Sequence, residues 1–135
     1  MTLESYNEDF GRGFLRDLGI RIVSVDPAVG RFVVTESAIA PNGYVFAAGV
    51  IALADGLAAM GTIESYPEGA SNHTTIELKS NFLGSARIGE TVEGRATPAH
   101  LGRTTQVWDV TVENTSTGKP MAIFRCTQMV LYPRD

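Results

Sequence analysis

The chain opens with a short amphipathic segment and two runs rich in β-branched residues. Aromatic residues recur at helical spacing among acidic and basic ones, which predicts one helix over about residues 5–18, ended by Gly19. Residues 20–25 and 31–35 favour strands, and the Pro and Gly between them favour a turn. The N-terminal part is therefore expected to form a helix and a β-hairpin.

Residues 44–63 differ in kind, because they are rich in Ala, Leu, Val and Gly and carry Asp55 as their only charge. The length approaches that of a membrane span, but three glycines and a central acid make a poor membrane helix. A helix that is apolar on nearly every side is a buried one. We expect a central helix over about residues 44–63, wrapped by the rest of the chain.

Four further segments have strand composition, and turn residues separate them. They are residues 75–82, 90–99, 104–113 and 121–132. In the first, Ile76, Leu78 and Phe82 alternate with polar residues and should share one face. A helix, two strands, a buried helix and four strands predict an α+β fold, with residues 1–135 as one domain whose curled antiparallel sheet wraps the central helix.

Composition and charge narrow the function classes. The net charge is −4, which argues against nucleic acid as the partner because a phosphate backbone needs a concentrated basic face. Cys126 is the single cysteine and cannot form an internal disulfide. The acidic start lacks the apolar run of a signal peptide, so we expect a cytoplasmic protein without membrane contact. His73 and His100 have no further ligands at metal-binding spacing, so no metal is expected.

Three motifs carry a resemblance to a known family. They are residues 43–55 (GYVFAAGVIALAD), residues 74–83 (TTIELKSNFL) and residues 102–104 (GRT). In this order they resemble the phenylacetate-degradation (PaaI-like) acyl-CoA thioesterases, which have the hotdog fold. That family has a histidine at the start of the central helix and an acid nine residues later. Here Asp55 takes the place of the acid, Phe46 stands at the histidine position, and Ala40 stands where the family often has Asn or Gln.

The resemblance implies roles for three residues. Asp55 would act as nucleophile or general base, and the backbone N–H of Ala47 would stabilise the oxyanion. The Thr75 hydroxyl would face the acid across a dimer interface, although Thr75 is equally well explained as an ordinary strand residue. The residues themselves support Asp55, because its helical neighbours are apolar and a buried carboxylate is costly without a function.

Six positions are expected to bind substrate, although a phenylalanine such as Phe82 on an alternating face is more often a core residue, and a solvated turn explains Arg103 equally well. Arg103 would meet the phosphates of coenzyme A, since a guanidinium group suits phosphate oxygens. The six are Asn42, Phe46, Asn81, Phe82, Gly102 and Arg103.

The function expected from this resemblance is hydrolysis of a small aromatic or medium-chain acyl-CoA, with coenzyme A as part of the substrate and no other cofactor. The alternative is a hotdog protein that binds acyl-CoA or another apolar ligand without turnover, which Phe46 favours. An acyl-CoA hydratase or dehydratase ranks third, because the central helix has no histidine. A homodimer with sheets joined edge to edge is expected, and a homotetramer is left open.

Overall fold

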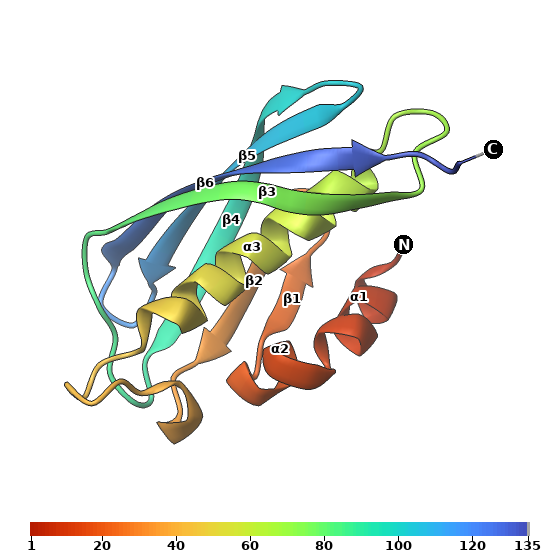
Figure 1. Ribbon diagram of the computed structural model, residues 1–135. Helices are drawn as coiled ribbons and strands as arrows, with labels where there is room; N and C mark the ends of the chain where they lie inside the picture. Colours follow the sequence, from red (N-terminus) through yellow and green to blue (C-terminus); the bar gives the residue numbers. More distant parts are fainter. Residues whose placement is uncertain (135) are drawn as a thin grey trace.

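The computed structural model describes residues 1–134 as an antiparallel sheet curled around one long helix (Figure 1). The helices are α1 (Leu3–Phe10), α2 (Gly13–Leu18) and α3 (Ala47–Glu64), with a short 3₁₀ turn η1 (Glu36–Ala38). The strands are β1 (Arg21–Ser24), β2 (Ala28–Val33), β3 (Asn72–Phe82), β4 (Thr91–Leu101), β5 (Thr105–Asn114) and β6 (Lys119–Leu131). Their order across the sheet is β1-β2-β4-β5-β6-β3. This confirms the predicted α+β hotdog fold.

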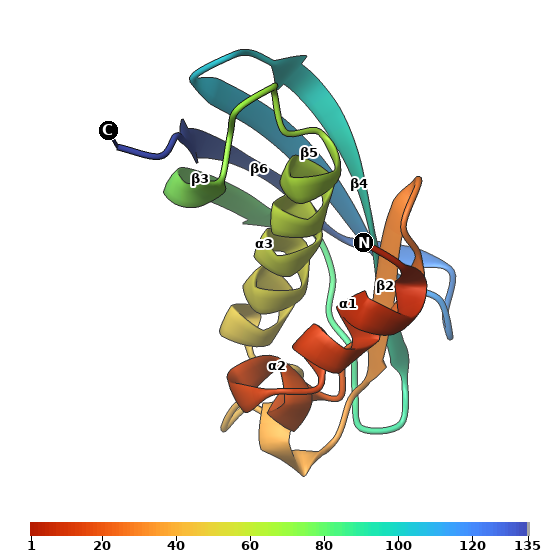
Figure 2. The ribbon, with the colours of Figure 1, turned by 90° about the vertical axis from the view of Figure 1, so that its right-hand side faces the viewer.

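Helix α3 lies in the hollow of the sheet, as Figure 2 shows. It has the length and composition of a membrane-spanning helix, yet one side of it packs on the strands, where Leu53 and Leu57 are completely buried. Close approach is possible because Gly61 faces Trp108 of β5. A Cβ atom at this position would lie 2.6 Å from the indole ring. The small residues of α3 thus set how deeply the helix sits in the sheet.

Helix α3 starts at Ala47, three residues later than predicted, because the preceding residues remain extended. The Val45 N–H donates to the Ala86 carbonyl at 2.8 Å, and the Phe46 N–H donates to the Ala38 carbonyl at 2.7 Å. These bonds hold the chain in the β conformation up to Phe46, which is the N-cap residue and makes no side-chain capping bond.

The single N-terminal helix predicted from the sequence is wrong, because α1 and α2 are separate. Gly11 ends α1, and Gly13 has a φ angle of 57°, a left-handed conformation that glycine adopts at little cost. The break lets α1 bury Tyr6, whose hydroxyl donates to Glu64 at 2.7 Å. It also turns α2 across the open side of α3 (Figure 2).

Strand β3 is an edge strand, and a β-bulge interrupts it between Thr75 and Glu77. Ile76 falls in the bulge without a partner on β6, so the continuous alternation predicted for this strand is wrong. Beyond the bulge, Leu78 and Phe82 lie opposite the buried Cys126 and Ala122 and therefore face the hollow. They nevertheless remain 42% and 45% exposed in the single chain.

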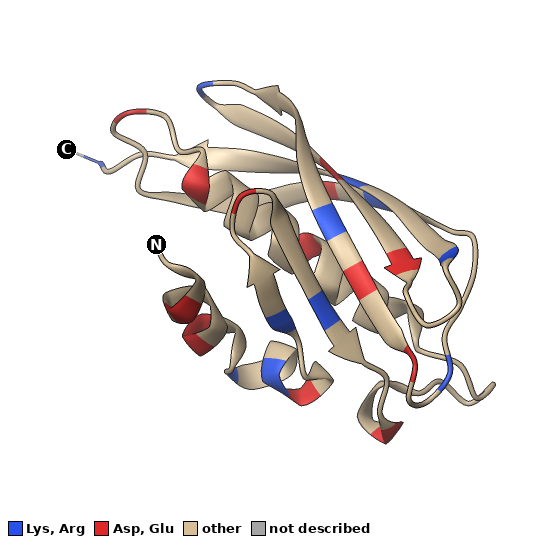
Figure 3. Ribbon diagram, turned by 180° about the vertical axis from the view of Figure 1, so that it is seen from behind, with Lys and Arg blue, Asp and Glu red and all other residues tan. Residues whose placement is uncertain are grey.

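Acidic and basic residues are interspersed along the strands of the sheet (Figure 3). Arg125 of β6 pairs with Asp109 of β5 at 2.6 Å, and Arg31 of β2 lies 3.6 Å from Glu93 of β4. Exposed pairs of this kind contribute little to stability. They do prevent charge of one sign from accumulating on these strands.

Candidate active site

Asp55 lies on the side of α3 that the sheet leaves open. Its carboxylate is half-buried in a groove of about 420 Å³ between α3 and α2, and it is the only charged group there. Small residues at helical spacing form the floor, and Phe14 and Leu15 of α2 form a wall. The lining residues of α3 are Ala48, Ile51, Ala52, Asp55, Gly56 and Ala59. An acid in this setting faces an apolar space of ligand size.

The Thr75 hydroxyl contacts this acid directly. Its oxygen Oγ1 donates a hydrogen bond to Oδ1 of Asp55 at 2.9 Å, and both residues belong to the same chain. The expectation that this pair would form across a dimer interface is therefore wrong. The reason is the position of β3, which runs along α3 as the last strand of the sheet and places Thr75 on the hollow side. One carboxylate oxygen of Asp55 is thus held, and Oδ2 makes no protein hydrogen bond within residues 1–134.

His73 is a neighbour of the pair that the sequence analysis considered only as a metal ligand. It lies two residues before Thr75 on the same face of β3, and its Nδ1 is 2.7 Å from the Tyr66 hydroxyl. Burial lowers the pKa of His73, and the negative charge of Asp55 opposes part of that effect. The alternation of β3 counted back from Thr75 was the signal that could have identified His73.

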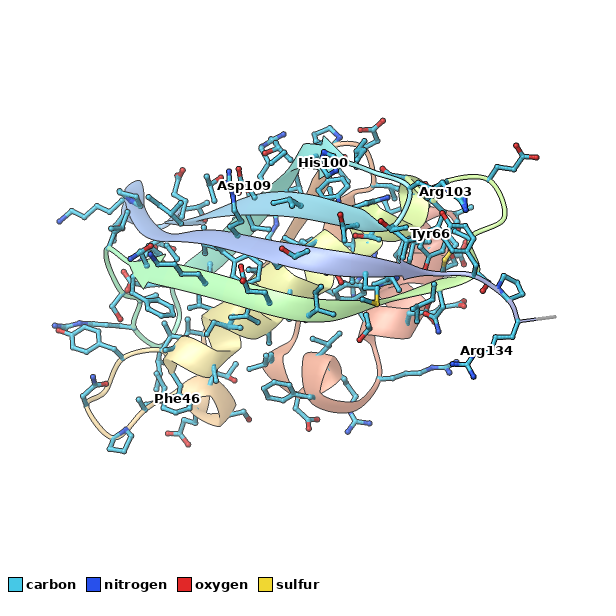
Figure 4. All side chains as sticks on the ribbon, turned by 45° about the horizontal axis from the view of Figure 1, so that its top comes forward. Phe46, Tyr66, His100, Arg103, Asp109 and Arg134 are labelled. Carbon is cyan, nitrogen blue, oxygen red and sulfur yellow. The ribbon has the colours of Figure 1, made fainter. Side chains whose placement is uncertain are left out.

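A second pocket of about 290 Å³ lies at the start of α3, and three of the six predicted substrate-binding residues line it: Asn42, Phe46 and Phe82. Phe46 is half-exposed at the rim (Figure 4). The N–H of Ala47, which also lines the pocket, makes no hydrogen bond to any residue of the range 1–134. A free N–H at a helix N-terminus is a ready donor for developing negative charge.

Asp55 and Ala47 are too far apart in one chain to act on the same carbonyl. Eight residues separate them along α3, which corresponds to about 12 Å of helix axis. Groups that stabilise an oxyanion or deliver a nucleophile lie within roughly 3 Å of the reacting atoms. The two predicted catalytic elements therefore lie in two different pockets of the single chain.

Asn81 lines neither the groove beside Asp55 nor the pocket at Phe46 in the single chain, and its substrate-binding role stays a prediction. It lies opposite Ile123, a half-exposed residue of β6, and lines a shallow groove on the outer face of the sheet. Consecutive strand residues point to opposite faces, so Asn81 and Phe82 cannot line the same pocket.

Gly102 and Arg103 lie in the turn between β4 and β5, at the far end of α3 from Phe46 (Figure 4). A Cβ on Gly102 would lie 2.6 Å from the His100 ring, so this position requires glycine for packing. The Arg103 guanidinium lies over the Tyr132 ring, 5.5 Å from its centroid. In one chain, this predicted phosphate-binding turn is therefore remote from the pocket at Phe46.

Other reactive groups are not arranged for chemistry. Within residues 1–134, no three His, Cys, Asp or Glu side chains gather as metal ligands. Burial raises the pKa of the Cys126 thiol to about 12, and the Asp55 charge adds to the effect. Cys126 is completely buried beside Gln128, so it is a neutral neighbour of the site rather than a nucleophile.

Known proteins share this chain's sequence and fold. Residues 42–121 match the family described as the Thioesterase superfamily. The protein named "Putative esterase ComA2" from Bacillus subtilis (strain 168) is 31% identical over 130 residues, which are 91% of this chain and 98% of that protein.

Two solved thioesterases match nearly the whole chain. A mutant of thioesterase PA1618 from Pseudomonas aeruginosa has a TM-score of 0.90 and 29% identity, covering 98% of this chain and 96% of that one. Thioesterase HI1161 from Haemophilus influenzae has a TM-score of 0.88 and 26% identity, covering 98% and 92%.

The sheet curls around α3, which presents Asp55 to an apolar groove, and this chain belongs to the thioesterase superfamily. It is a thioester hydrolase, as the sequence predicted. The PaaI-like subtype stays a prediction.

Proposed function

We propose that this protein hydrolyses acyl-CoA thioesters, with the acyl group in the groove beside Asp55. The observation that carries the proposal is the Asp55–Thr75 pair, a carboxylate held on one oxygen and facing an apolar space. A protein that only binds an acyl chain has no need for a charged group in that space, because a buried charge weakens apolar binding.

The reaction follows from these groups. Asp55 takes a proton from water, or attacks directly, and the thioester carbonyl carbon gains a bond to oxygen. The carbonyl oxygen becomes an oxyanion, which accepts a hydrogen bond from an Ala47 N–H. The intermediate then collapses, the C–S bond breaks, and the sulfur leaves with a proton as free thiol. If Asp55 activates water, the acyl group leaves as the carboxylic acid. If Asp55 attacks directly, the acyl group stays on its carboxylate as an anhydride, which a water molecule then hydrolyses to the acid.

The separation of Ala47 from Asp55 favours a site shared between two subunits. The free edge of β3 presents unpaired backbone groups together with the half-exposed Leu78 and Phe82, which suits edge-to-edge pairing. Antiparallel pairing of two β3 strands would set the Thr75 end of one beside the Phe82 end of the other. Ala47 of the partner subunit would then approach Asp55. The same arrangement would bring Arg103 of the partner subunit towards the pocket at Phe46, where it could bind the phosphates of coenzyme A.

The groove favours a small aromatic or medium-length acyl group. About 420 Å³ over a floor of alanine and glycine accommodates a flat ring or an extended chain. Phe14 lies at the side of the groove and is 60% exposed, so an acyl group can pack against its ring. Phe14 was missed in the sequence, where it was interpreted only as part of an amphipathic helix.

The test is thiol release from a panel of aliphatic and aromatic acyl-CoAs by the wild type, Asp55→Ala and Asp55→Asn. We expect kcat to fall roughly 10²- to 10⁴-fold in both variants, with folding and subunit mass unchanged. Asp109→Asn is the matched control, because this carboxylate lies on the outer face of the sheet and pairs with Arg125. Saturable binding of an acyl-CoA without turnover by the wild type would instead place the protein among the ligand-binding hotdog proteins.

A further inference from the structure

A row of buried polar side chains crosses the hollow face of the sheet behind Asp55. Thr75 of β3 lies directly opposite Gln128 of β6, and Gln128 lies opposite Gln106 of β5. Both glutamines are completely buried. Gln106 has a clear structural task, because its amide donates to the Ser65 carbonyl at the C-terminal end of α3 at 2.9 Å. Within residues 1–134 the Gln128 side chain makes no comparable bond to the backbone, and its partners are the side chains of Thr75 and Cys126.

A proton count at Thr75 determines how Gln128 must be oriented. The Thr75 oxygen lies 2.9 Å from Oδ1 of Asp55 and 3.0 Å from Oε1 of Gln128, but a hydroxyl has one proton. A carboxylate is the stronger acceptor, so the Thr75 hydroxyl donates its proton to the hydrogen bond with Asp55. Gln128 must then offer a donor to Thr75 rather than a second acceptor. An amide satisfies this by a half-turn that exchanges its oxygen and nitrogen, which have nearly the same shape.

The same half-turn improves the other contact of Gln128. Its amide nitrogen lies 3.5 Å from the Cys126 sulfur, which is a weak acceptor. After the exchange, the Gln128 oxygen faces the Cys126 thiol and accepts its S–H. Each donor in the row then has one acceptor. Cys126 donates a hydrogen bond to Gln128, Gln128 donates one to Thr75, and Thr75 donates one to Asp55.

We propose that Gln128 is a positioning residue for Asp55, whose amide N–H fixes the Thr75 hydroxyl so that its proton points at the carboxylate. Without this donor, the Thr75 hydroxyl is free to turn away from Asp55. The charged form of Asp55 then loses a hydrogen bond, and the ionised state on which the reaction depends forms at higher pH. This inference rests on the proposed function, since it assigns the control of the same carboxylate.

The groups around Asp55 allow the effect to be isolated. His73 of β3, Tyr66 after α3 and Cys126 of β6 are the titratable neighbours, and α2 contributes the apolar Phe14 and Leu15. Cys126 stays neutral through the neutral range. His73 remains in place when Gln128 is replaced, so its contribution is common to all variants compared.

The test compares Gln128→Met with Gln106→Met, two buried glutamines in the same row. We expect Gln128→Met to move the acid limb of the pH profile of kcat/KM upward by roughly one pH unit, and Thr75→Val to move it equally. The double variant should show no additional shift. Gln106→Met should lower the melting temperature and leave the acid limb in place. The proposal would be overturned if the acid limb of Gln128→Met stayed at the wild-type pH. It would also be overturned if the shifts of the two single variants added in the double variant.

A readout independent of turnover separates this inference from the proposed function. The pH titration of the Asp55 side-chain carboxyl by ¹³C NMR, assigned with Asp55→Asn, should show the same upward shift in Gln128→Met. If the wild type hydrolyses no acyl-CoA but the shift is present, the function fails and the positioning role stands. If turnover depends on Asp55 but the NMR titration is unchanged, the positioning role fails. Gln128→Leu replaces Gln128→Met should the latter not fold.

Discussion

The two sides of α3 differ little in hydrophobicity and have opposite roles. On the side against the sheet, Leu53, Leu57 and Ala58 are completely buried. On the side facing the groove, Ala52 and Ala59 are partly exposed, and Asp55 is the only charge. Hydrophobicity therefore does not decide which side faces the sheet. Packing decides it, because the side against the sheet has glycine where a strand approaches closely, and the side facing the groove has small residues that form a floor for a ligand. Substitutions on the two sides should separate stability from activity.

Apart from replacement of Asp55 itself, the largest effect is expected at the exposed start of the helix, where Ala47→Pro removes the N–H and little else. Proline is tolerated at the first helical position, and Phe46 before it already has the extended conformation that proline requires. We expect kcat to fall about 10²- to 10³-fold with an unchanged melting temperature. Ala47→Gly keeps the N–H and serves as the control. Equal kcat in the two variants would exclude this N–H as the oxyanion donor.

On the packed side, Gly61→Ala should lower stability and leave the turnover of folded protein unchanged. Alanine favours a helix over glycine, but its Cβ would lie 2.6 Å from the Trp108 ring. The expected loss is roughly 1–3 kcal/mol in urea unfolding. Gly56→Ala gains the same helix propensity, and its Cβ would lie 3.0 Å from the Phe10 ring, which is a less severe contact. Gly56→Ala should therefore unfold at a higher urea concentration than Gly61→Ala. If Gly61→Ala instead unfolded at the higher urea concentration, the Trp108 ring would move aside at little cost.

Phe14→Ala should change which acyl groups are preferred. Removing one wall of the groove should lower kcat/KM about tenfold for aromatic and medium-chain acyl-CoAs, while acetyl-CoA, which is too short to reach the ring, should be unaffected. Leu3→Ala, a half-exposed residue of α1 outside the groove, is the control. An equal fall for every acyl length would mean that Phe14 supports α2 rather than the substrate.

The smallest effect concerns Cys126 beneath the site. Burial raises the pKa of the Cys126 thiol from 9.0 to about 12. Between these two pH values the folded protein keeps the thiol proton while the unfolded chain loses it. The stability that this thiol contributes is therefore complete below about pH 9 and is lost as the pH rises towards 12. At pH 8 we expect no reaction with a thiol reagent in the native protein and full reaction in urea. Rapid native labelling would contradict the buried position.

The fold and the identity of Asp55 could be predicted from local sequence. Residues 44–63 are apolar apart from Asp55, so the chain itself marks both the buried helix and its one unusual residue. The N-terminal helix was predicted too long because the periodicity of its aromatic residues continues across Gly11 and Gly13, where the backbone turns. Periodicity records which residues are buried and does not record whether the segment between them is continuous.

The contacts of the site could not be predicted, because they depend on strand pairing. Thr75 meets Asp55 of its own chain because β3 lies at the sheet edge beside β6, and not beside β4, the strand that follows it in sequence. Gln128 gives no local signal, since a glutamine in a strand is ordinarily solvated. Asn81 was assigned to a pocket because it is polar and adjacent to Phe82, although adjacent strand residues point to opposite faces.

The bulge in β3 means that the length of this strand is as important as its residues. His73 and Thr75 precede the bulge and Leu78 and Phe82 follow it, and all four face the hollow only because one extra residue sits between them. Loss of Ile76 alone would remove the extra residue and leave a regular strand with these four side chains still on one face. Among related chains, a one-residue insertion or deletion that no bulge absorbs would instead turn part of the strand, and with it part of the active site, to the outer face.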